Sequence, residues 1–390
     1  MSSSDQVRVT FKKEVVMGEL DLTGDLNTCR ILTDSLSGTP RTIPTDEVTG
    51  DRMSTGQDVV GMDVGGGFGI KLSPDPFHDA MIEAGMMMSW TAAIDEAIAL
   101  TLDVTAGTIT KTGGTDFTTI FTVGDLAALS GMTNGVNNGM VYVVAVAADV
   151  LTVIFPDEMV DEVGIGSVIS LEPYVEVSNE KITYSFMKDF LDLTSKSISY
   201  LGQRSNGFDF NFTFGEHVTG NYNFMGVDWR TPTPPDSDGR TIIPISTEGL
   251  LNASQDMGLV VLDGEKVDFC IKTLSLALDN GLDPQECIGH LAPTDQIPGD
   301  AAITVGMEAY LADTNFDMVQ DKMSNIPVSI SYYALNSNGL GYAFQIPAVQ
   351  LSFPDPVNEG KGSQTMLNME GVAKKDIVFG NILRIYKVGE

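Results

Sequence analysis

Basic residues are scarce in this chain of 390 residues, in which 22 Lys and Arg stand against 53 Asp and Glu, for a formal net charge of −31 at pH 7. Contacts to nucleic-acid phosphates need clustered Lys and Arg, so the composition excludes a general nucleic-acid-binding surface. Hydrophobic residues make up 43% of the chain and charged residues only 19%. This balance indicates folded domains rather than a disordered chain, and the length allows two or three of them.

Cysteine and histidine are equally scarce, with three of each: Cys29, Cys270, Cys287, His78, His217 and His290. The odd number of cysteines and the absence of CxxC spacing predict free thiols in a reducing compartment rather than a disulfide framework. The histidines are far apart and form no HxxxH or HExxH pattern, so a zinc site is not expected. We expect structural or surface histidines and no cofactor.

Other functional motifs are also absent. Gly65–Gly69 is glycine-rich, but no lysine-serine pair follows it, which argues against a phosphate loop. The turns at Asp236–Gly239 and Asp279–Asp283 lack the distal glutamate of a calcium loop. The longest apolar run, Val141–Phe155, is interrupted by Asp149 and is too short to span a bilayer. No secretory signal, no GxSxG motif and no catalytic set stand out, so we expect neither an enzyme nor a membrane protein.

The clearest pattern present is a strict alternation between Ser205 and Val227. Aromatic rings alternate with small polar or acidic side chains, which is the period-2 pattern of strands that are buried on one face only. The rings are Phe208, Phe210, Phe212, Phe214, Tyr222 and Phe224, and the polar residues are Asp209, Asn211, Thr213, Asn221 and Asn223. A short glycine-bearing turn joins the two runs, so we predict an antiparallel hairpin with one packing face and one polar face.

The first 96 residues contain a polar segment, a strand and a helix. Residues 1–60 are rich in Ser, Thr and Gly, and they predict either a mobile loop segment or strands that order only against a neighbouring subunit. Gly61–Leu72 is a glycine-rich strand. Ser73 as a cap and Pro74 at the first helical position predict a helix, with an apolar stripe that begins at Phe77.

Residues 97–172 differ in composition from the rest of the chain. They are rich in Thr, Val, Gly and Asp, and short strands follow one another at Gly107–Thr110, Val141–Val146, Leu151–Ile154 and Ser167–Leu171. This spacing predicts a small all-β domain. We interpret it as an insertion on a surface loop, where loop closure costs little entropy.

The second half of the chain repeats features of the first, after a proline-rich linker at residues 231–245. Aligning Gly67 with Gly306 also aligns Phe77 with Phe316, at the start of a second strand-and-helix unit. Farther on, Val349, Leu351 and Phe353 alternate with Gln350 and Ser352, and Met366–Val372 parallels Asn223–Val227. We therefore predict a duplicated unit, with residues 1–96 and 173–230 forming the first domain and residues 246–390 the second.

Two stretches resemble the tail tube (major tail) proteins of long-tailed, siphovirus-like bacteriophages. FDFNFTFGEHVTGNYNFMGVD, with Gly202–Gly207 (GQRSNG) before it and Val218-Thr219-Gly220 within it, is similar to the core hairpin of that family. GTITKTGG and FTVGDLAALSGMTNGVNNGMVYVVAVAADVLTV resemble an insert that the family carries. Ala127 and Ala128 depart from the insert pattern, which usually has a charged residue or valine there.

The resemblance implies a mainly β, duplicated tail-tube fold, an antiparallel β-sandwich or barrel segment with one flanking helix per copy and an inserted small β domain. It implies a virion structural protein, assembled in the host cytoplasm, whose rings stack into a tube. Three chains with pseudo-six-fold symmetry, or six chains, would form a ring. Tape measure and tail terminator or tip proteins would be further partners, with DNA present only in transit. The residues expected to face the lumen are Asp209, Asn211, Thr213, Asn221, Asn223, Gln350 and Ser352.

Two other functions remain open at this point. An adhesin-like or receptor-binding virion protein would use the small β domain as its active part. A hydrolase acting on surface glycans would need two carboxylates at a fixed separation in a cleft. The segment at residues 20–60 is a candidate arm that lies on a neighbouring ring and orders during assembly.

Overall fold

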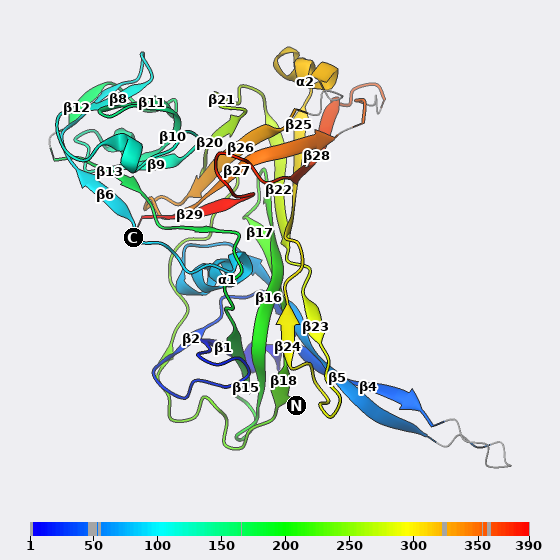
Figure 1. Ribbon diagram of the computed structural model, residues 1–390. Helices are drawn as coiled ribbons and strands as arrows, with labels where there is room; N and C mark the ends of the chain where they lie inside the picture. The colour runs from blue at the N-terminus through cyan, green and yellow to red at the C-terminus, as the bar shows by residue number, and fades with distance from the viewer. Residues whose placement is uncertain are drawn as a thin grey trace.

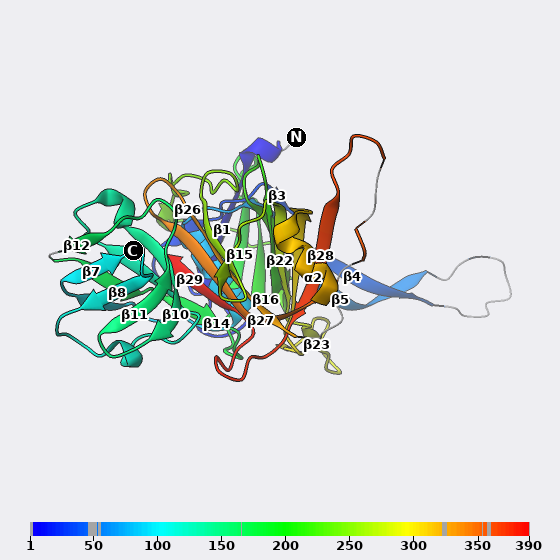
Figure 2. The same cartoon turned by 90° about the horizontal axis from the view of Figure 1, so that it is seen from above.

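The computed structural model describes residues 3–45, 53, 56–164, 166–321, 326–352, 354–356 and 360–389. The protein is mainly β, as predicted, with a large sheet, a separate eight-stranded sheet and a two-stranded hairpin. Figure 1 and Figure 2 show the eight-stranded sheet on one side of the body, while the hairpin of β4 and β5 projects away on the other side. No helix in the described part of the chain is long and apolar enough to cross a membrane.

The strands of the large sheet come from both halves of the chain. The first half contains β1 (Val7–Lys13), β2 (Leu26–Thr28), β3 (Thr33–Asp34), β4 (Ser37–Pro44), β5 (Gln57–Lys71), α1 (Pro76–Met86), β14 (Tyr174–Glu176), β15 (Tyr184–Phe190), β16 (Ser197–Thr213), β17 (Thr219–Met225) and β18 (Asp228–Arg230). The second half contains β19 (Ile242–Ile243), β20 (Met257–Leu262), β21 (Glu265–Lys266), β22 (Ile271–Asp279), β23 (Asp283–Gln285), β24 (Asp295–Ile297), β25 (Ala302–Tyr310), α2 (Phe316–Asp321), β26 (Val328–Leu335), β27 (Gly341–Ser352), β28 (Met366–Ala373) and β29 (Arg384–Val388).

The N-terminal segment is ordered within its own chain, so both predictions for residues 1–60 are wrong for their described part. β1 pairs antiparallel with β15, from Val7 opposite Phe190 to Lys13 opposite Tyr184. β4 pairs along its length with β5. The partner strand β15 is distant in sequence and supplies backbone hydrogen bonds to β1.

Helix α1 begins two residues later than predicted. Asp75, rather than Ser73, is the N-cap, and its carboxylate accepts hydrogen bonds from the backbone N–H groups of Phe77 and His78. Pro76 occupies the first turn, where a missing N–H costs nothing. The helix packs closely on the large sheet: a Cβ added at Gly85 would lie 2.5 Å from a ring carbon of Phe208.

The two halves follow the same order of strand pairing. In the first half β1–β15–β16–β17–β5–β4 are neighbours in that order, and in the second half β20–β26–β27–β28–β25–β22 are. Gly67 lies opposite Asn223, and Gly306 lies opposite Glu370, so these two pairs correspond. The sequence comparison placed Asn368 with Asn223, whereas the strand pairing aligns it with Asn221. A shift of two residues leaves each side chain on the same face of the strand.

The second helix differs from the first. Phe316 was aligned with Phe77, yet its side chain is 48% exposed, whereas Phe77 is 2% exposed. α2 is only six residues long, and Met318 and Val319 pack partly against the core instead. The predicted correspondence between Phe316 and Phe77 is therefore wrong. Phe353, the last apolar residue of the alternation predicted from Val349, lies outside the described residues.

The eight-stranded sheet contains every strand predicted within residues 97–172 and four more. Its order is β12-β7-β8-β11-β10-β9-β13-β6. The predicted strands are β8 (Thr108–Lys111), β10 (Gly139–Val146), β11 (Val150–Ile154) and β13 (Val168–Leu171), and the others are β6 (Ile94–Ala97), β7 (Leu100–Asp103), β9 (Leu126–Ser130) and β12 (Glu162–Gly164). Ala127 and Ala128 lie in β9 and are buried, so the small side chains serve packing.

One aromatic core joins the two halves of the large sheet. The Phe210 ring lies 5.9 Å from the Phe344 ring on β27, and the Phe212 ring lies 5.3 Å from Tyr332 on β26. Tyr332 and Phe344 stack with their centroids 5.0 Å apart. Edge-to-face and stacked rings of this kind add stability beyond their buried area. The halves are therefore packed as one body.

Candidate lumen-facing surface

The predicted hairpin is formed by β16 and β17. Asp209 lies opposite Asn221, and Phe208 lies opposite Tyr222. Five of the six rings that were assigned to the packing face have side chains buried in the core: Phe208, Phe210, Phe212, Tyr222 and Phe224. The sixth assignment, Phe214, is wrong, because this side chain is 73% exposed. β16 ends at Thr213, so the alternation of faces no longer applies one residue later.

The polar residues of the hairpin lie on the face opposite the aromatic core, here called the open face. Asp209, Asn211 and Thr213 are half-buried, and Asn221 and Asn223 are exposed. β22 of the second half pairs with the other edge of β16, from Gly207 opposite Asp279 to Thr213 opposite Thr273. The open face therefore continues from the first half into the second.

The remaining two predicted residues lie at the far end of the same sheet. Gln350 and Ser352 are exposed on β27, where Gln350 lies opposite Val372 and Ser352 opposite Glu370 of β28. β28 pairs in turn with β25 and β25 with β22. The sequence-predicted residues thus belong to one sheet but lie at separate places on it.

A hydrogen-bonded cluster surrounds the one carboxylate predicted on this face. The Asn221 side-chain amide donates to both carboxylate oxygens of Asp209, at 3.1 Å each. Asn211 donates to the same carboxylate at 3.4 Å. These bonds orient Asp209 and leave a largely neutral, hydrogen-bonding surface around its charge.

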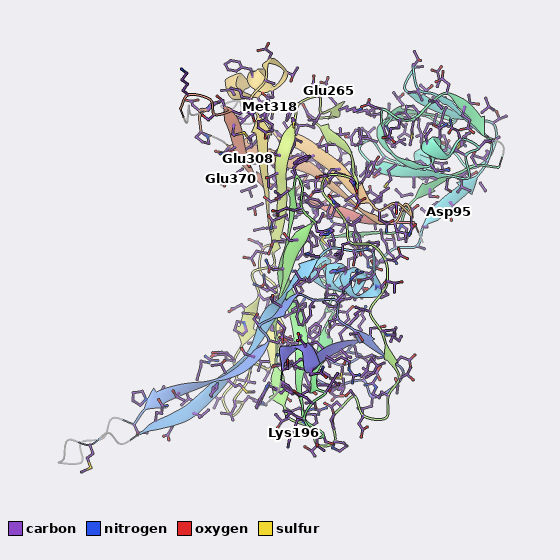
Figure 3. The ribbon with its side chains drawn as sticks, turned by 180° about the vertical axis from the view of Figure 1, so that it is seen from behind. Asp95, Lys196, Glu265, Glu308, Met318 and Glu370 are labelled. Atoms are coloured by element: carbon purple, nitrogen blue, oxygen red, sulfur yellow. The ribbon has the colours of Figure 1, made fainter. Side chains whose placement is uncertain are left out.

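Two carboxylates on the open face were not among the predicted residues. Glu308 on β25 and Glu370 on β28 lie near each other on the side of the molecule away from the eight-stranded sheet (Figure 3). Lys272 pairs with Glu308 at 3.2 Å, while Glu370 is exposed. The sequence could have identified Glu308. Ile303, Val305 and Met307 alternate with the residues between them, which assigns Glu308 to the face opposite the buried one.

Beneath the hairpin, α1 contributes a buried polar group. The Nδ1 atom of His78 lies 3.0 Å from the Tyr222 hydroxyl, and both side chains are fully buried. Burial lowers the pKa of His78 to about 4, although the nearby Asp75 opposes the shift. Burial raises the pKa of Tyr222 well above its ordinary value. The histidine is therefore neutral at pH 7 and structural, as the sequence predicted.

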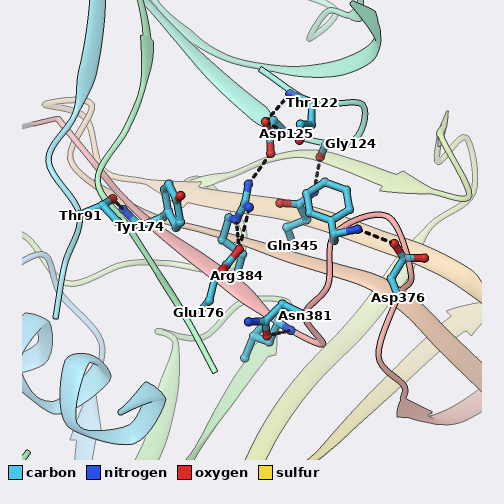
Figure 4. Close-up of polar contacts among 12 residues, drawn as sticks. Thr91, Thr122, Gly124, Asp125, Tyr174, Glu176, Gln345, Asp376, Asn381 and Arg384 are labelled. Carbon is cyan, nitrogen blue, oxygen red and sulfur yellow. Dashed lines mark hydrogen bonds and ion pairs between the residues drawn. The ribbon is translucent and has the colours of Figure 1, made fainter. Parts of the chain in front are cut away.

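The eight-stranded sheet is fixed to the body by a buried ion-pair cluster (Figure 4). Arg384 of β29 pairs with Asp125 at 2.5 Å and with Glu176 of β14 at 2.6 Å. The Tyr386 hydroxyl donates to Gln345 at 2.7 Å, and the Gln345 amide donates to the Gly124 carbonyl at 2.6 Å. Gly124 and Asp125 directly precede β9, a strand of the eight-stranded sheet. These contacts therefore hold the eight-stranded sheet against β27 and β29.

Among the described residues, no group of three or more His, Cys, Asp or Glu is placed to hold a metal ion. A family model described as Phage tail tube protein matches residues 4–373, nearly the whole chain. A search of curated proteins gives no match. The chain therefore belongs to the phage tail tube protein family and is a non-enzymatic structural subunit of the virion tail, where it associates with copies of itself.

Proposed function

We propose that three copies of this chain close into a ring with pseudo-six-fold symmetry, and that such rings stack into the hollow tail tube of a siphovirus-like phage. The observation that carries the proposal is the repeated order of strand pairing, which supports the assignment of each half as one tail-tube unit. Each half would be one of six units in a ring. Ring closure also removes exposed sheet edges, which are otherwise sites of uncontrolled association.

In this assembly the open face lines the lumen. Its described residues are mostly small or neutral, and its carboxylates outnumber the lysines that pair with them. Acidic and neutral groups repel or ignore phosphates, so DNA passes without being held. Asp209, Asn211, Thr213, Asn221, Asn223, Gln350 and Ser352 are the proposed lining residues.

The eight-stranded sheet, as an inserted domain at residues 97–172, is proposed to decorate the outside of the tube. Figure 3 supports this placement, since the sheet lies on the side of the body opposite Glu308 and Glu370. The β4–β5 hairpin extends away from the body and is the proposed arm that reaches a neighbouring ring (Figure 1). Tape measure and tail terminator or tip proteins are the proposed partners at the lumen and the tube ends.

Electron microscopy of the purified chain tests the proposal. The expected result is hollow tubes or discrete rings, and end-on views count the chains in each ring. A chain that stays monomeric under all ionic conditions would contradict the tube. Six chains to a ring would instead contradict the assignment of both halves as tube units.

The lumen assignment has its own test. Replacing Asp209 and Asn211 with lysine adds positive charge where DNA is proposed to pass, so we expect intact tubes but slower genome delivery. Tube formation is followed by microscopy and delivery by DNA ejection from assembled virions. The matched control is lysine at Glu265, an exposed residue of β21. Unchanged ejection from the Asp209 and Asn211 variant would remove these residues from the channel wall.

A further inference from the structure

We propose that the segment between β28 and β29 (residues 374–383), here called the docking loop, binds the turn between β15 and β16 (residues 191–196) of a second copy in the adjacent ring. A second exposed apolar turn, between β23 and β24 (residues 286–294), belongs to the same stacking face. The inference rests on the proposed ring, and it names the surfaces through which one ring contacts the next.

The docking loop and the β23–β24 turn carry the most exposed apolar side chains. Ile377 is 97% exposed and Val378 is 82% exposed, and Ile288 in the β23–β24 turn is fully exposed. These are three of the four most exposed large hydrophobic side chains among the described residues. Aliphatic groups left in water cost hydrophobic free energy, and contiguous ones mark surfaces that contact another protein.

The docking loop holds its two aliphatic residues in a fixed turn. The Asp376 carboxylate accepts hydrogen bonds from the backbone N–H groups of Val378 and Phe379, at 2.8 Å each. The Gly380 N–H donates to the Asp376 carbonyl at 3.0 Å, which closes the turn. The Phe379 ring then anchors the loop, since its centroid lies 5.1 Å from the Arg384 guanidinium. The turn is thus built to present its apolar side chains to solvent.

The first half has no counterpart of the docking loop in its described residues. β29 pairs with β27 and β18 pairs with β16, so β29 and β18 correspond. Residues 374–383 separate β28 from β29, whereas only residues 226–227 separate β17 from β18. The exposed turn is therefore an addition to the repeated unit, and the repeated strand pairing does not require it.

Two lysines give the docking loop a local positive charge. Lys374 and Lys375 precede the turn and are exposed, and no carboxylate of the described residues pairs with them. Most other basic residues do pair with a carboxylate of their own chain. Because the chain has a formal net charge of −31, the lysine pair is complementary to an acidic surface of another copy.

The docking loop and the β23–β24 turn face along the proposed tube axis. The open face and the eight-stranded sheet lie on opposite sides of the body (Figure 3), so the line between them is radial. Figure 1 places β1 and β15 of the first half below β20 and β26 of the second, so that line runs around the ring. Figure 2 looks along this second line and shows the tube axis as its vertical direction. The segment before β29 and the turn after β23 both lie at the lower margin of that view.

The opposite margin, at the top of Figure 2, carries the N-terminal residues. The Leu191 N–H donates to the Gln6 carbonyl at 2.8 Å, so the turn of residues 191–196 lies against the 3-10 helix η1 (Ser4–Gln6). Leu191 is 54% exposed and Leu193 39%, and Asp5 of η1 is exposed. This margin therefore offers apolar groups and a carboxylate, where the docking loop offers apolar groups and lysines.

A contact between opposite margins of identical chains is heterologous, since each copy contributes a different surface. When rings are stacked through such a contact, every added ring leaves the same surface free for the next one. The contact therefore extends into a tube with one direction, rather than ending at a pair of rings.

Substitution of the docking loop tests the contact. Ile377→Asp with Val378→Asp replaces both aliphatic groups by carboxylates at exposed sites, and circular dichroism checks that the fold is kept. Loss of one buried aliphatic contact shifts an association equilibrium by about tenfold or more. We expect rings to form, and tubes to appear in electron micrographs only at a ring concentration higher by at least that factor. The matched control is Val163→Asp, which is 66% exposed on β12 of the eight-stranded sheet and should leave tubes unchanged.

Charge reversal tests the two lysines. In Lys374→Glu with Lys375→Glu, the docking loop would repel Asp5 of the adjacent ring, so we expect fewer tubes at low ionic strength. Added salt screens the repulsion between exposed charges and should restore part of the stacking. Tube formation that equals the parent chain at low salt would remove the lysines from the contact.

Mixing of two variants tests which margin receives the docking loop. Leu191→Asp with Leu193→Asp alters the proposed receiving turn, so this variant should also give rings without tubes. The docking-loop variant keeps an intact receiving turn, and the receiving-turn variant keeps an intact docking loop. An equimolar mixture of the two kinds of ring should therefore form pairs of rings and stop there, which sedimentation measures. Absence of ring pairs in the mixture would overturn the assignment of the receiving turn.

The outcomes separate this inference from the proposed function. Normal tubes from the Ile377→Asp and Val378→Asp variant would overturn the docking loop as a stacking contact while leaving the tube itself in place. Folded variant chains that form no rings would place the loop in a contact within the ring and would also overturn the stacking role. A parent chain that forms neither rings nor tubes would overturn the proposed function instead.

Discussion

The ion pair between Arg384 and Asp125 gives the sharpest test of how the eight-stranded sheet is held. Only 12% of the Arg384 side chain and 2% of the Asp125 side chain are exposed. Replacing Arg384 with leucine leaves the Asp125 carboxylate buried. Among the described residues its remaining donors are then Thr122 and the Tyr386 hydroxyl, whose single proton also serves Gln345. We expect this variant to lose stability mainly through the uncompensated negative charge.

The expected loss can be bounded from the geometry. Removing one partner of a buried ion pair lowers the free energy of unfolding by about 3–5 kcal/mol. Glu176 also loses its partner, but its side chain is 21% exposed and can be hydrated, so it adds little. Removing the Asp125 charge as well, with Asp125→Asn in the Arg384→Leu background, should recover most of the loss.

Urea unfolding at pH 7, followed by circular dichroism, measures the four members of this double-mutant cycle. Limited proteolysis is run in parallel, and the rate of cleavage between Ala97 and Glu172 reports whether the eight-stranded sheet is still held in place. A loss below about 1 kcal/mol for Arg384→Leu would refute the reasoning, since that is the range of exposed ion pairs. Additive losses in the double variant would also refute it, because the argument requires the two charges to be coupled.

Three further predictions concern the core beneath the open face. The folded-state pKa of His78 is about 4 against 6.5 in the unfolded chain, so stability should fall by about 3 kcal/mol as pH drops from 6.5 to 4. His78→Gln should remove that part of the pH dependence in urea titrations. Gly207 has φ +145°, and the Cβ of Gly207→Ala would lie 1.9 Å from the Leu278 carbonyl oxygen. In the control Gly215→Ala the added Cβ has no atom within 4 Å, so we expect the thermal midpoint of Gly207→Ala to be the lower of the two. Phe212→Ala should lower the free energy of unfolding by about 3–5 kcal/mol, because Phe212 is buried in the core. Phe214 is exposed, so an equal loss for Phe214→Ala would contradict the assigned faces.

Local periodicity was sufficient to predict the strands whose two faces differ in polarity. The alternation in Phe208–Thr213 matches β16, because one face of this strand is buried against the aromatic core. β4 lacks such a contrast and depends on pairing with β5. β1 does carry the alternation, because Val7, Val9 and Phe11 are separated by polar side chains, so local periodicity could have found this strand. The alternation also carries no information on where a strand ends, which is why Phe214 was misassigned.

The contacts that connect the parts of the molecule could not be predicted. Arg384 and Asp125 are far apart in the sequence, and neither lies in a motif that identifies the other. The same applies to Arg204 and Gln296, although Arg204 belongs to the GQRSNG stretch that the sequence analysis singled out. Side-chain pairing across a fold depends on topology, and one sequence does not supply it.

The unequal chemistry of the two halves has a consequence for the symmetry of the tube wall. Where the second half carries Glu308 and Glu370, the first half carries Gly69 and Asn223 at the corresponding positions of the open face. Six identical single-unit subunits would repeat every charge at each step around the axis. Joining two units in one chain frees them to diverge, so in the proposed ring the carboxylates lie at different places in alternate sectors, Asp209 in one and Glu308 with Glu370 in the next. The electrostatic potential of the channel then has a three-fold rather than a six-fold period.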